Sequence, residues 1–374
     1  MQSSRTLLAT AVIAAAQALL PATASAQNKR ELVYGSFASP SAPDSKAAQA
    51  FLDRLNAEAG LSVRFRSAFG GAMGGPREVL ANIGSGVLDS GQGIDGLMQR
   101  EFAGSALLRN LGILSDNEIA ATGAANETML LNCDRCRQDA EASKVLTLAY
   151  YTNTNYVLLC RSALQSAADF GSKRVRAAGE FAAVVRYMGA TPVQIPFPET
   201  YEALQRGQVE CSHSQIGYLR SLNFWDVAKH VYEDPIGSYN SAQLLAINRN
   251  LWRSLPAADR DTIRSRLASG VADAVFRGLE EEKEVRALAA GKGVTFAKLP
   301  AELSSKLAQW RTPANMAVVV NEAAQRLSVK DADKLAATFR EKLDKWNRML
   351  PEISKSRDAF AAALDREVFS KVGD

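Results

Sequence analysis

The residue types that carry most acid–base and metal chemistry are scarce in this chain of 374 residues. It holds only two histidines, His213 and His230, and four cysteines, at positions 133, 136, 160 and 211. Histidine is the usual general base near neutral pH and the commonest metal ligand, so two of them leave little material for hydrolase chemistry or a histidine-rich metal centre. We therefore expect no catalytic activity, no metal and no cofactor.

The four cysteines form two groups whose interpretation depends on the compartment. Cys133 and Cys136 enclose Asp-Arg in a polar stretch, whereas Cys160 and Cys211 each close a strand-like segment. An exported protein usually pairs an even number of cysteines, and four allow three connectivities. We predict a short structural Cys133–Cys136 disulfide and a Cys160–Cys211 bridge between neighbouring strands. A catalytic C-x-x-C of an exported thiol oxidoreductase and a zinc half-site are the alternatives for the first pair.

Residues 1–26 carry the pattern of a secretory signal peptide. Arg5 precedes an apolar run from Leu7 to Leu20, and Ala24-Ser-Ala26 forms an A-x-A cleavage site. The run is shorter than the roughly 20 residues that a membrane-spanning helix needs. We predict a mature chain that begins at Gln27 and is exported to the periplasm.

The charge balance argues against a nucleic-acid partner. Lys and Arg number 44 against 40 Asp and Glu, which gives a formal net charge of +4, and the charges are interspersed along the chain. Such a weak field does not support binding dominated by the phosphate backbone. With 47% hydrophobic and 22% charged residues, the composition is that of a globular protein and excludes a disordered one. We expect a monomer.

Strand-like and helix-like segments alternate through the first two thirds of the chain. The alternation of Val63 and Phe65 with Arg64 and Arg66, for example, is typical of a half-buried strand. We expect strands near 32–34, 61–69, 145–160, 174–176, 192–196 and 243–247, and helices near 47–55, 181–188 and 200–205. This order predicts an α/β protein with parallel sheets.

A long helix is predicted from Pro256 to Gly291. Its apolar positions recur every four residues, at Ile263, Leu267, Val271, Val275 and Leu279. At about 1.5 Å per residue the helix would measure roughly 50 Å, longer than one domain needs, so we expect it to span two domains. A last strand is expected at 293–296. The segment 300–374 is expected to be mostly helical, with breaks at Pro313 and Pro351.

Two segments could hold an anionic small molecule. The Gly-rich stretch 69–78 leads into a predicted helix, so its N–H groups could face an anion, but it lacks the spacing of a nucleotide-binding loop. A tight strand-to-helix turn is the alternative interpretation. Arg176 ends a predicted strand next to a turn, a position that also suits an ordinary surface charge.

Five phrases keep a common order and rough spacing along the chain. They are Gly70-Gly-Ala-Met-Gly-Gly-Pro-Arg-Glu-Val-Leu80, Gly86-Val-Leu-Asp89, Ser166 to Arg176, Met188 to Glu199 and Tyr201 to Glu210. They resemble the dicarboxylate-type solute receptors of tripartite ATP-independent periplasmic (TRAP) transporters. In that family the phrases run approximately G-G-x-L-G-x-x-R-E, D-L-K-G-x-K-I-R and G-A-x-P-x-x-x-x-x-E-x-Y-x-A-L-Q-x-G-x-V-D. The resemblance covers essentially the whole mature chain.

The resemblance implies a two-domain Venus-flytrap receptor with a cleft, hinge strands and a long helix that braces both domains. We expect domain I at 27–152 plus 243–290 and domain II at 153–242 plus 291–374. The implied function is to capture a small organic solute that carries a carboxylate and to deliver it to TRAP membrane subunits. A flytrap that signals to a sensor protein is an alternative use of the same fold.

The resemblance also places Arg176 where the family binds a ligand carboxylate and offers Phe197 as a wall of the cleft. A planar guanidinium suits this role because its donors match a carboxylate bidentately. The family's G-Q-E-N is replaced here by Cys211-Ser-His-Ser214, and a second family Arg falls at about Asn155 or Tyr156. This less cationic, more aromatic cleft favours a monocarboxylate, hydroxylated or partly apolar solute over a doubly charged acid.

The predicted ligand-binding residues come from several separate segments of the chain. They are Arg176, Ser214, His213, Phe197, Asn155, Tyr156, Tyr151, Gln92 and Gly75. His213 is either a cleft residue or an ordinary polar loop residue. The tyrosines at 150, 151 and 156 are either cleft walls or core aromatics.

Overall fold

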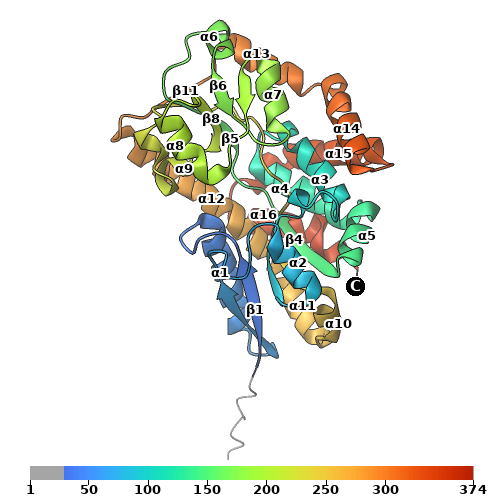
Figure 1. Cartoon of the computed structure of the whole chain (residues 1–374). Helices are drawn as coiled ribbons and strands as arrows, with labels where there is room; N and C mark the ends of the chain where they lie inside the picture. The colour runs from blue at the N-terminus through green and yellow to red at the C-terminus, as the bar shows by residue number, and fades with distance from the viewer. Residues whose placement is uncertain (1–28, 374) are drawn as a thin grey trace, which may run out of the picture.

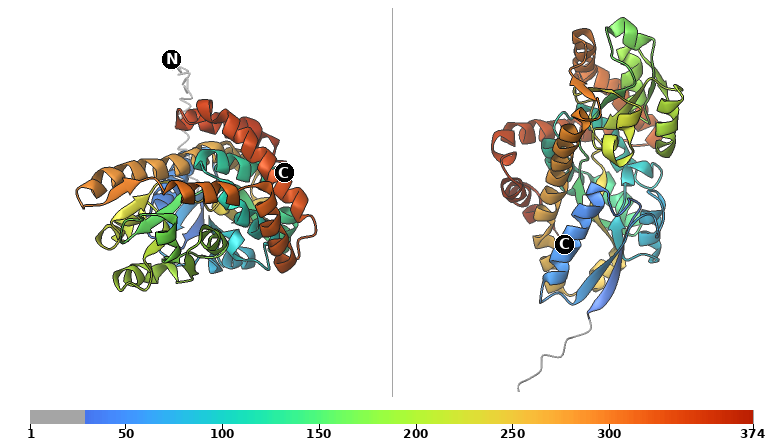
Figure 2. Two further views of the ribbon diagram at one scale, coloured as in Figure 1. Left: turned by 90° about the horizontal axis from the view of Figure 1, so that it is seen from above. Right: turned by 90° about the vertical axis from the view of Figure 1, so that its left-hand side faces the viewer.

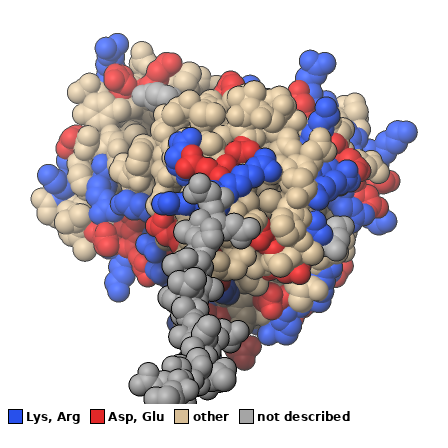
Figure 3. Space-filling model, turned by 90° about the horizontal axis from the view of Figure 1, so that it is seen from below, with Lys and Arg blue, Asp and Glu red and all other residues tan. Residues whose placement is uncertain are grey.

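The computed structural model describes residues 29–373 and contains two mixed sheets, one above the other in Figure 1. The predicted signal peptide at residues 1–26 lies outside the described residues. Within residues 29–373, no helix is both long and apolar enough to cross a membrane. Lys and Arg side chains are interspersed with Asp and Glu over the face that Figure 3 shows from below.

The first sheet has five strands and the helices that follow β1 to β3. In spatial order its strands are β2 (Val63–Ala68), β1 (Arg30–Ser36), β3 (Ser90–Gln92), β10 (Ala242–Asn248) and β4 (Val145–Tyr151). Its connecting helices are α1 (Pro43–Ala57), α2 (Glu78–Ser85), α3 (Ala103–Asn110), α4 (Glu118–Asn126) and α5 (Asp134–Ala142). Strand β1 pairs in parallel with β2 and β3, whereas β10 is antiparallel to β3 and β4.

The second sheet has six strands. Their spatial order is β11 (Thr295–Ala297), β9 (His230–Tyr232), β5 (Tyr156–Cys160), β8 (Cys211–Gln215), β6 (Arg174–Arg176) and β7 (Thr191–Val193). Its connecting helices are α6 (Ala167–Gly171), α7 (Phe181–Met188), α8 (Thr200–Gln205) and α9 (Tyr218–Ser221). Strand β6 is parallel to β7 and β8, and β5 is antiparallel to β8 and β9.

The sheets are mixed, and not parallel throughout as the sequence predicted, because two short segments cross between them. Residues 152–155 lead from β4 to β5, and residues 233–241 lead from β9 back to β10. Each of these crossings leaves one sheet at the carboxyl-terminal edge of its parallel strands and enters the other sheet at the carboxyl-terminal edge of that sheet's parallel strands. The chain must then run against the strands that end there, which makes β5 and β10 antiparallel.

The predicted long helix is present as two helices that meet at Arg266. They are α11 (Ala257–Ser265) and α12 (Leu267–Ala290), preceded by α10 (Arg249–Ser254). At Arg266 the side chain binds the Glu58 carboxylate, with Nε to Oε1 at 2.8 Å. The 24 residues of α12 span about 36 Å, and the helix runs from the lower to the upper sheet in Figure 1. The expected domain-spanning helix therefore exists, but it begins at Leu267 and not at Pro256.

The four C-terminal helices are α13 (Ala301–Trp310), α14 (Pro313–Leu327), α15 (Ala332–Ile353) and α16 (Arg357–Glu367). Of these, α13 packs on α7 of the second sheet, and the other three pack mainly in the first sheet's core. Buried residues from Val320 to Phe369 share one hydrophobic cluster with β1, α1 and β10, and α12 contacts both α1 and α16 (Figure 2). Arg357 binds the buried Asp273 of α12, with Nη1 to Oδ1 at 2.6 Å. The predicted assignment of 291–374 to the second domain stays a prediction.

Both predicted disulfides are confirmed. Cys160 and Cys211 occupy paired positions of β5 and β8, where they join central strands of the second sheet. Cys133 and Cys136 lie at the start of α5 and are 2% and 5% exposed. All four cysteines are thus used as structural links.

The two disulfides should differ in their contribution to stability. Cys160 and Cys211 are 51 residues apart in sequence, so their loss should lower the free energy of unfolding by about 2–5 kcal/mol. The matched Cys133→Ala/Cys136→Ala variant opens a loop of sequence separation 3 and should lose less. Denaturant unfolding of both double variants measures this. A Cys160→Ala/Cys211→Ala protein within about 1 kcal/mol of wild type would contradict the prediction.

Candidate functional site

The predicted site residues gather where the strands of the two sheets end. Strand β6 ends at Arg176 and β8 at Gln215 in the second sheet, while β3 ends at Gln92 and β4 at Tyr151 in the first. Four residues separate Tyr151 from the start of β5, so the two edges face each other across the crossings. Ligands of α/β proteins bind outside the carboxyl ends of the strands, so this is the place to look for a site.

Arg176 is a buried cation without an acidic partner. It is 6% exposed and pairs in register with Ser212 of β8 and Val193 of β7. Its Nε donates to the Ile195 carbonyl at 3.2 Å, and its guanidinium carbon lies 5.7 Å from the centroid of the Phe197 ring. Within residues 29–373, no carboxylate forms an ion pair with it. A buried charge without a counter-charge is costly, so the remaining guanidinium donors suit an anionic ligand.

An aromatic cluster lies beside Arg176. Its members are Tyr156, Phe181, Phe197, His213, Tyr218 and Tyr239. The Tyr156 ring is central, because its centroid lies 4.9 Å from both His213 and Tyr239. The Phe197 and Tyr218 centroids are 4.7 Å apart, which extends the cluster from η4 (Phe197–Glu199) to α9. The cluster gives the edge of the second sheet an aromatic surface around one cation.

His213 lies within the β8 strand and not in a loop. It is fully buried, with its ring 4.3 Å from Phe181, and neither ring nitrogen has a hydrogen-bond partner among the described residues. Burial, together with the charge of Arg176, lowers the pKa of His213 from 6.5 to about 3. The neutral imidazole keeps one donor and one acceptor for a bound molecule. Its neighbour Ser214 is also buried, and the Ser212 and Ser214 Oγ atoms are 2.7 Å apart.

The first sheet contributes a chain of hydrogen bonds at its facing edge. Ser36 Oγ donates to Gln92 Oε1 at 2.8 Å, and Gln92 Nε2 donates to Tyr151 Oη at 2.6 Å. The Tyr151 hydroxyl donates in turn to Asp44 Oδ2 at 3.4 Å. Tyr150 points elsewhere, because its hydroxyl donates to the buried Asp95 at 2.8 Å. Tyr151 is therefore the tyrosine of this pair that borders the facing edge.

Two of the predicted site residues have other contacts in the structure. Asn155 Nδ2 donates to Glu118 Oε2 at 2.7 Å, and Asn155 lines a different cavity of about 280 Å³ with Glu282 and Arg286. Gly75 lies at the start of α2, where its carbonyl accepts from the backbone N–H of Glu78 at 3.0 Å. Their predicted role in ligand binding stays a prediction.

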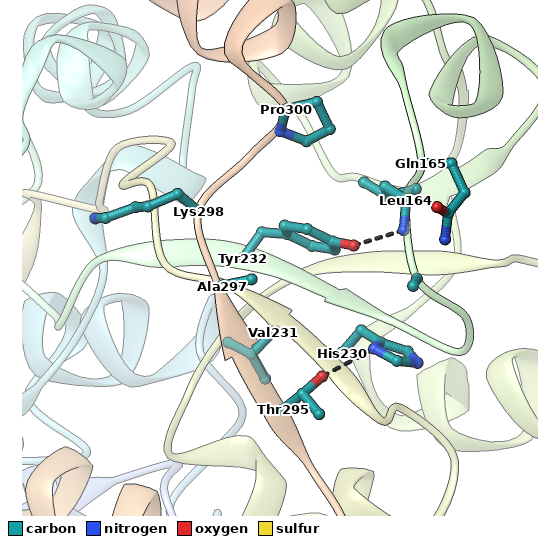
Figure 4. A pocket seen from close by; sticks show the side chains of 10 residues that line it. Leu164, Gln165, His230, Val231, Tyr232, Thr295, Ala297, Lys298 and Pro300 are labelled. Carbon is teal, nitrogen blue, oxygen red and sulfur yellow. Dashed lines mark hydrogen bonds between the residues drawn. The ribbon is translucent and has the colours of Figure 1, made fainter.

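A larger cavity, of about 420 Å³, lies at the outer edge of the second sheet (Figure 4). His230 and Thr295 of β9 and β11 face each other there, with Nδ1 and Oγ1 2.9 Å apart. The Tyr232 hydroxyl accepts from the Leu164 N–H at this cavity. None of the predicted site residues lines it, so size alone does not identify the candidate site.

Sequence reasoning missed several polar residues at the facing edges. Arg109 of α3 lies with its guanidinium carbon 3.9 Å from the Tyr239 centroid, and its Nε is 3.4 Å from Glu180 Oε1. This ion pair joins a helix of the first sheet to the start of α7 in the second. Both charged residues interrupt apolar runs in the sequence, and this interruption could have marked them as candidate site residues. Asp44 and Tyr218 carried no such signal.

In the part of the chain that the structure describes, no group of three or more His, Cys, Asp or Glu is arranged to hold a metal ion. The candidate site offers one guanidinium without an ion pair to a described residue, a neutral imidazole, aromatic rings and hydrogen-bonding side chains.

The chain is similar to known solute-binding proteins. The model of the family described as "Bacterial extracellular solute-binding protein, family 7" matches residues 34–325. The chain is 28% identical over 195 residues to the C4-dicarboxylate-binding periplasmic protein of Rhodobacter capsulatus, covering 51% of this chain and 56% of that protein. It is 25% identical over 161 residues to the ectoine-binding periplasmic protein of Halomonas elongata, covering 41% and 45%. It thus spans about half the length of these curated relatives.

Solved structures share the fold over most of the chain. A TRAP solute-binding protein from Rhodoferax ferrireducens, in complex with copurified benzoate, has a TM-score of 0.70 and 20% sequence identity. The match covers 85% of this chain and 99% of that one. The likeness establishes the two-domain α/β fold of periplasmic solute-binding proteins, as the sequence predicted.

The neutral state of His213 should make stability depend on pH. The pKa in the folded protein is about 3 and the ordinary value is 6.5, so protonation below pH 6.5 favours the unfolded chain. The free energy of unfolding should fall by about 2 kcal/mol more in wild type than in His213→Phe between about pH 7 and pH 5. Denaturant unfolding at both pH values measures the difference. Equal pH dependence of the two proteins would show that His213 is readily protonated in the fold.

Proposed function

The chain belongs to bacterial extracellular solute-binding protein family 7, and we propose that it captures a small organic carboxylate for a TRAP transporter. The solute binds between the facing edges of the two sheets, and the loaded receptor delivers it to the membrane subunits. The protein acts in the periplasm, and its task is binding without chemical conversion of the solute.

Arg176 is the observation that carries this proposal. Arg176 is 6% exposed, ends strand β6 and lacks an ion-pair partner among the described residues. The free-energy cost of burying its charge is therefore incurred in the fold itself, before any ligand binds. A carboxylate offers the guanidinium two parallel charge-assisted hydrogen bonds in surroundings where water competes weakly. The aromatic cluster then provides the apolar surface for the rest of the solute.

The ligand classes of related proteins guide the choice of solute. The curated relatives are named for C4-dicarboxylates and ectoine, and the Rhodoferax structure holds benzoate. Of the two arginines that contact the aromatic cluster, Arg109 forms an ion pair with Glu180 and Arg176 forms none with a described residue. We therefore infer a solute with a single carboxylate in preference to a dianion.

The two crossings act as hinges in this proposal. Residues 152–155 and 233–241 join the sheets, and α12 packs in both cores. A solute that contacts both edges binds the closed form more tightly than the open form, so it shifts the population toward closure. The predicted boundaries, 27–152 plus 243–290 and 153–242 plus 291–374, place the hinges at these crossings.

The thiol oxidoreductase alternative finds no support in the surroundings of Cys133 and Cys136. The pair is disulfide-bonded and buried. The Cys136 sulfur packs closely against Gly104, because a Cβ atom at Gly104 would lie only 3.0 Å from it. A redox-active cysteine needs an accessible sulfur for thiol exchange. We therefore propose that the Cys133–Cys136 disulfide is structural.

Removing Arg176 should abolish most solute affinity without unfolding the protein. A solute is first selected by thermal shift from benzoate, ectoine, succinate and related acids. In Arg176→Ala the bound carboxylate loses its partner, so we expect a loss of about 2–5 kcal/mol, or roughly one and a half to four decades in Kd. Arg176→Lys should recover only part, because an ammonium cannot form the bidentate fork. Isothermal calorimetry measures all three proteins.

Arg174 provides the matched control for this experiment. It lies two residues away on the same strand, is exposed and pairs with Glu210. Arg174→Ala should keep wild-type affinity, and neither alanine variant should change the melting temperature of the empty protein greatly. Binding by Arg176→Ala within about threefold of wild type would refute the carboxylate role of Arg176.

Solute binding should also make the molecule more compact. Saturation with the selected solute should reduce the radius of gyration in small-angle X-ray scattering, because the two sheets close over it. Arg176→Ala at the same solute concentration should keep the radius of the empty protein. A saturated wild-type protein with an unchanged radius would exclude domain closure.

A further inference from the structure

We propose that the receptor closes by bringing Arg109 and Glu180 together, so that this ion pair fixes the closed alignment of the two sheets. This inference rests on the proposed function and adds the control of closure to it. It follows from the cores in which the two residues lie, from their burial and from their contacts.

The ion pair joins the two halves of the molecule. Arg109 lies on α3, whose Leu107 and Leu108 are buried in the core of the first sheet. Glu180 is the N-cap residue of α7, whose Phe181 is buried in the core of the second sheet. Arg109 Nε and Glu180 Oε1 are 3.4 Å apart, and α7 lies above α3 in Figure 1. Opening the receptor moves one core relative to the other, so it separates these two charges.

Both charges of the pair are largely removed from water. The Arg109 side chain is 12% exposed and the Glu180 side chain is 9% exposed. Burial raises the pKa of Glu180, although the charge of Arg109 and, less strongly, that of Arg326 on α14 oppose the shift. Removing one partner of a buried pair leaves the other charge uncompensated, which is far more costly than removing both. Each residue therefore needs the other in the closed form.

The surroundings of Arg109 hold its side chain in place. Gly96, which follows β3, leaves room for it, because a Cβ atom at Gly96 would lie 2.8 Å from Arg109 Cδ. The guanidinium carbon of Arg109 lies 3.9 Å from the centroid of the Tyr239 ring, so the cation stacks on this ring. An arginine that is already ordered loses little conformational freedom when Glu180 approaches it.

Asp95 is a second buried carboxylate in this part of the first sheet. Its Oδ2 accepts hydrogen bonds from Ser105 at 2.9 Å, from Tyr150 at 2.8 Å and from Gln243 at 3.3 Å. Within residues 29–373, Asp95 forms no ion pair with Arg109. Asp95 therefore belongs to a hydrogen-bond network of the first sheet, and the carboxylate that pairs with Arg109 comes from the other core.

Tyr239 connects the ion pair to the candidate site. It lies in the crossing of residues 233–241, and its ring centroid is 4.9 Å from that of Tyr156 and 5.1 Å from that of Phe181. Tyr239 thus contacts Arg109 and the other rings of the aromatic cluster at the same time. A solute that packs on Tyr156 favours the closed form, and so does the ion pair, so each strengthens the other.

The ion pair should affect all solutes alike. In the proposed function Arg176 contacts the solute, whereas Arg109 and Glu180 act on the equilibrium between the open and closed forms. A change in that equilibrium multiplies the dissociation constant of every solute by one factor, because the apparent affinity scales with the population of the binding-competent form. This common factor distinguishes control of closure from a contact with the solute.

Glutamine variants test the inference in the full mature protein. The probes are the two acids that bind wild type most tightly among benzoate, pyroglutamate, glucuronate, ectoine and succinate. Arg109→Gln and Glu180→Gln each leave a buried charge unpaired in the closed form, so each should weaken both probes at least about fivefold, by factors that agree within about twofold. Arg109→Lys keeps the charge and should lose less. Calorimetry measures each dissociation constant.

The double variant separates pairing from two independent effects. Arg109→Gln/Glu180→Gln leaves neither charge buried alone, so its loss of affinity should be at least about threefold smaller than the product of the two single losses. At solute saturation, Glu180→Gln should also keep a larger radius of gyration than wild type in small-angle X-ray scattering. The melting temperatures of the empty variants should stay close to that of wild type, because water reaches both residues in the open form.

Glu210→Gln provides the matched control. It removes the carboxylate of an ion pair that lies within the second sheet's half, between Glu210 and Arg174. This variant should keep the affinity of wild type for both probes and its radius at saturation.

The outcomes distinguish this inference from the proposed function. Wild-type affinity in Glu180→Gln, or single losses that simply multiply in the double variant, overturns the control of closure and leaves a carboxylate receptor. A loss confined to one probe also overturns it, because the pair then contacts that solute. Binding of both probes that is unaffected by Arg176→Ala overturns the proposed function itself.

Discussion

One helix, α12, packs in the cores of both sheets and so limits how the sheets can move relative to each other. The N-terminal half of α12, from Leu267 to Val275, is buried in the core of the first sheet, and Val285 and Ala289 are buried in that of the second. A helix of about 36 Å is stiff, so the two sheets can move relative to each other only by bending at its contacts and at the crossings. Each time the two sheets close, their facing edges therefore come together in the same alignment.

This alignment explains why the candidate site is built from strand ends. Arg176 closes a strand between two neighbours, and the Cys160–Cys211 disulfide joins the strands that carry Tyr156 and His213. Side chains on such positions are held by backbone hydrogen bonds and packing, so their polar groups need little ordering when a ligand arrives. The buried, unpartnered nitrogens of His213 and the unpaired guanidinium are tolerated because rigid surroundings hold them in place.

The sequence predicted well what depends on local pattern. The period of β2, the family phrase ending at Arg176 and the four-residue repeat of α12 all describe segments that the structure contains. Relations between distant segments were harder to predict. The packing of α15 and α16 on the first core and the Arg109–Glu180 ion pair depend on how distant segments meet in space, which no short pattern encodes. Asn155 instead binds Glu118, a partner 37 residues away.

A crystal structure of the protein with its solute bound tests the central claim most directly. We expect a solute that touches both sheets, with its carboxylate on the Arg176 guanidinium and the Tyr156 and Tyr218 rings alongside. A solute seated in the cavity beside His230 and Tyr232, or one held between the sheets with Arg176 free of its carboxylate, would contradict it.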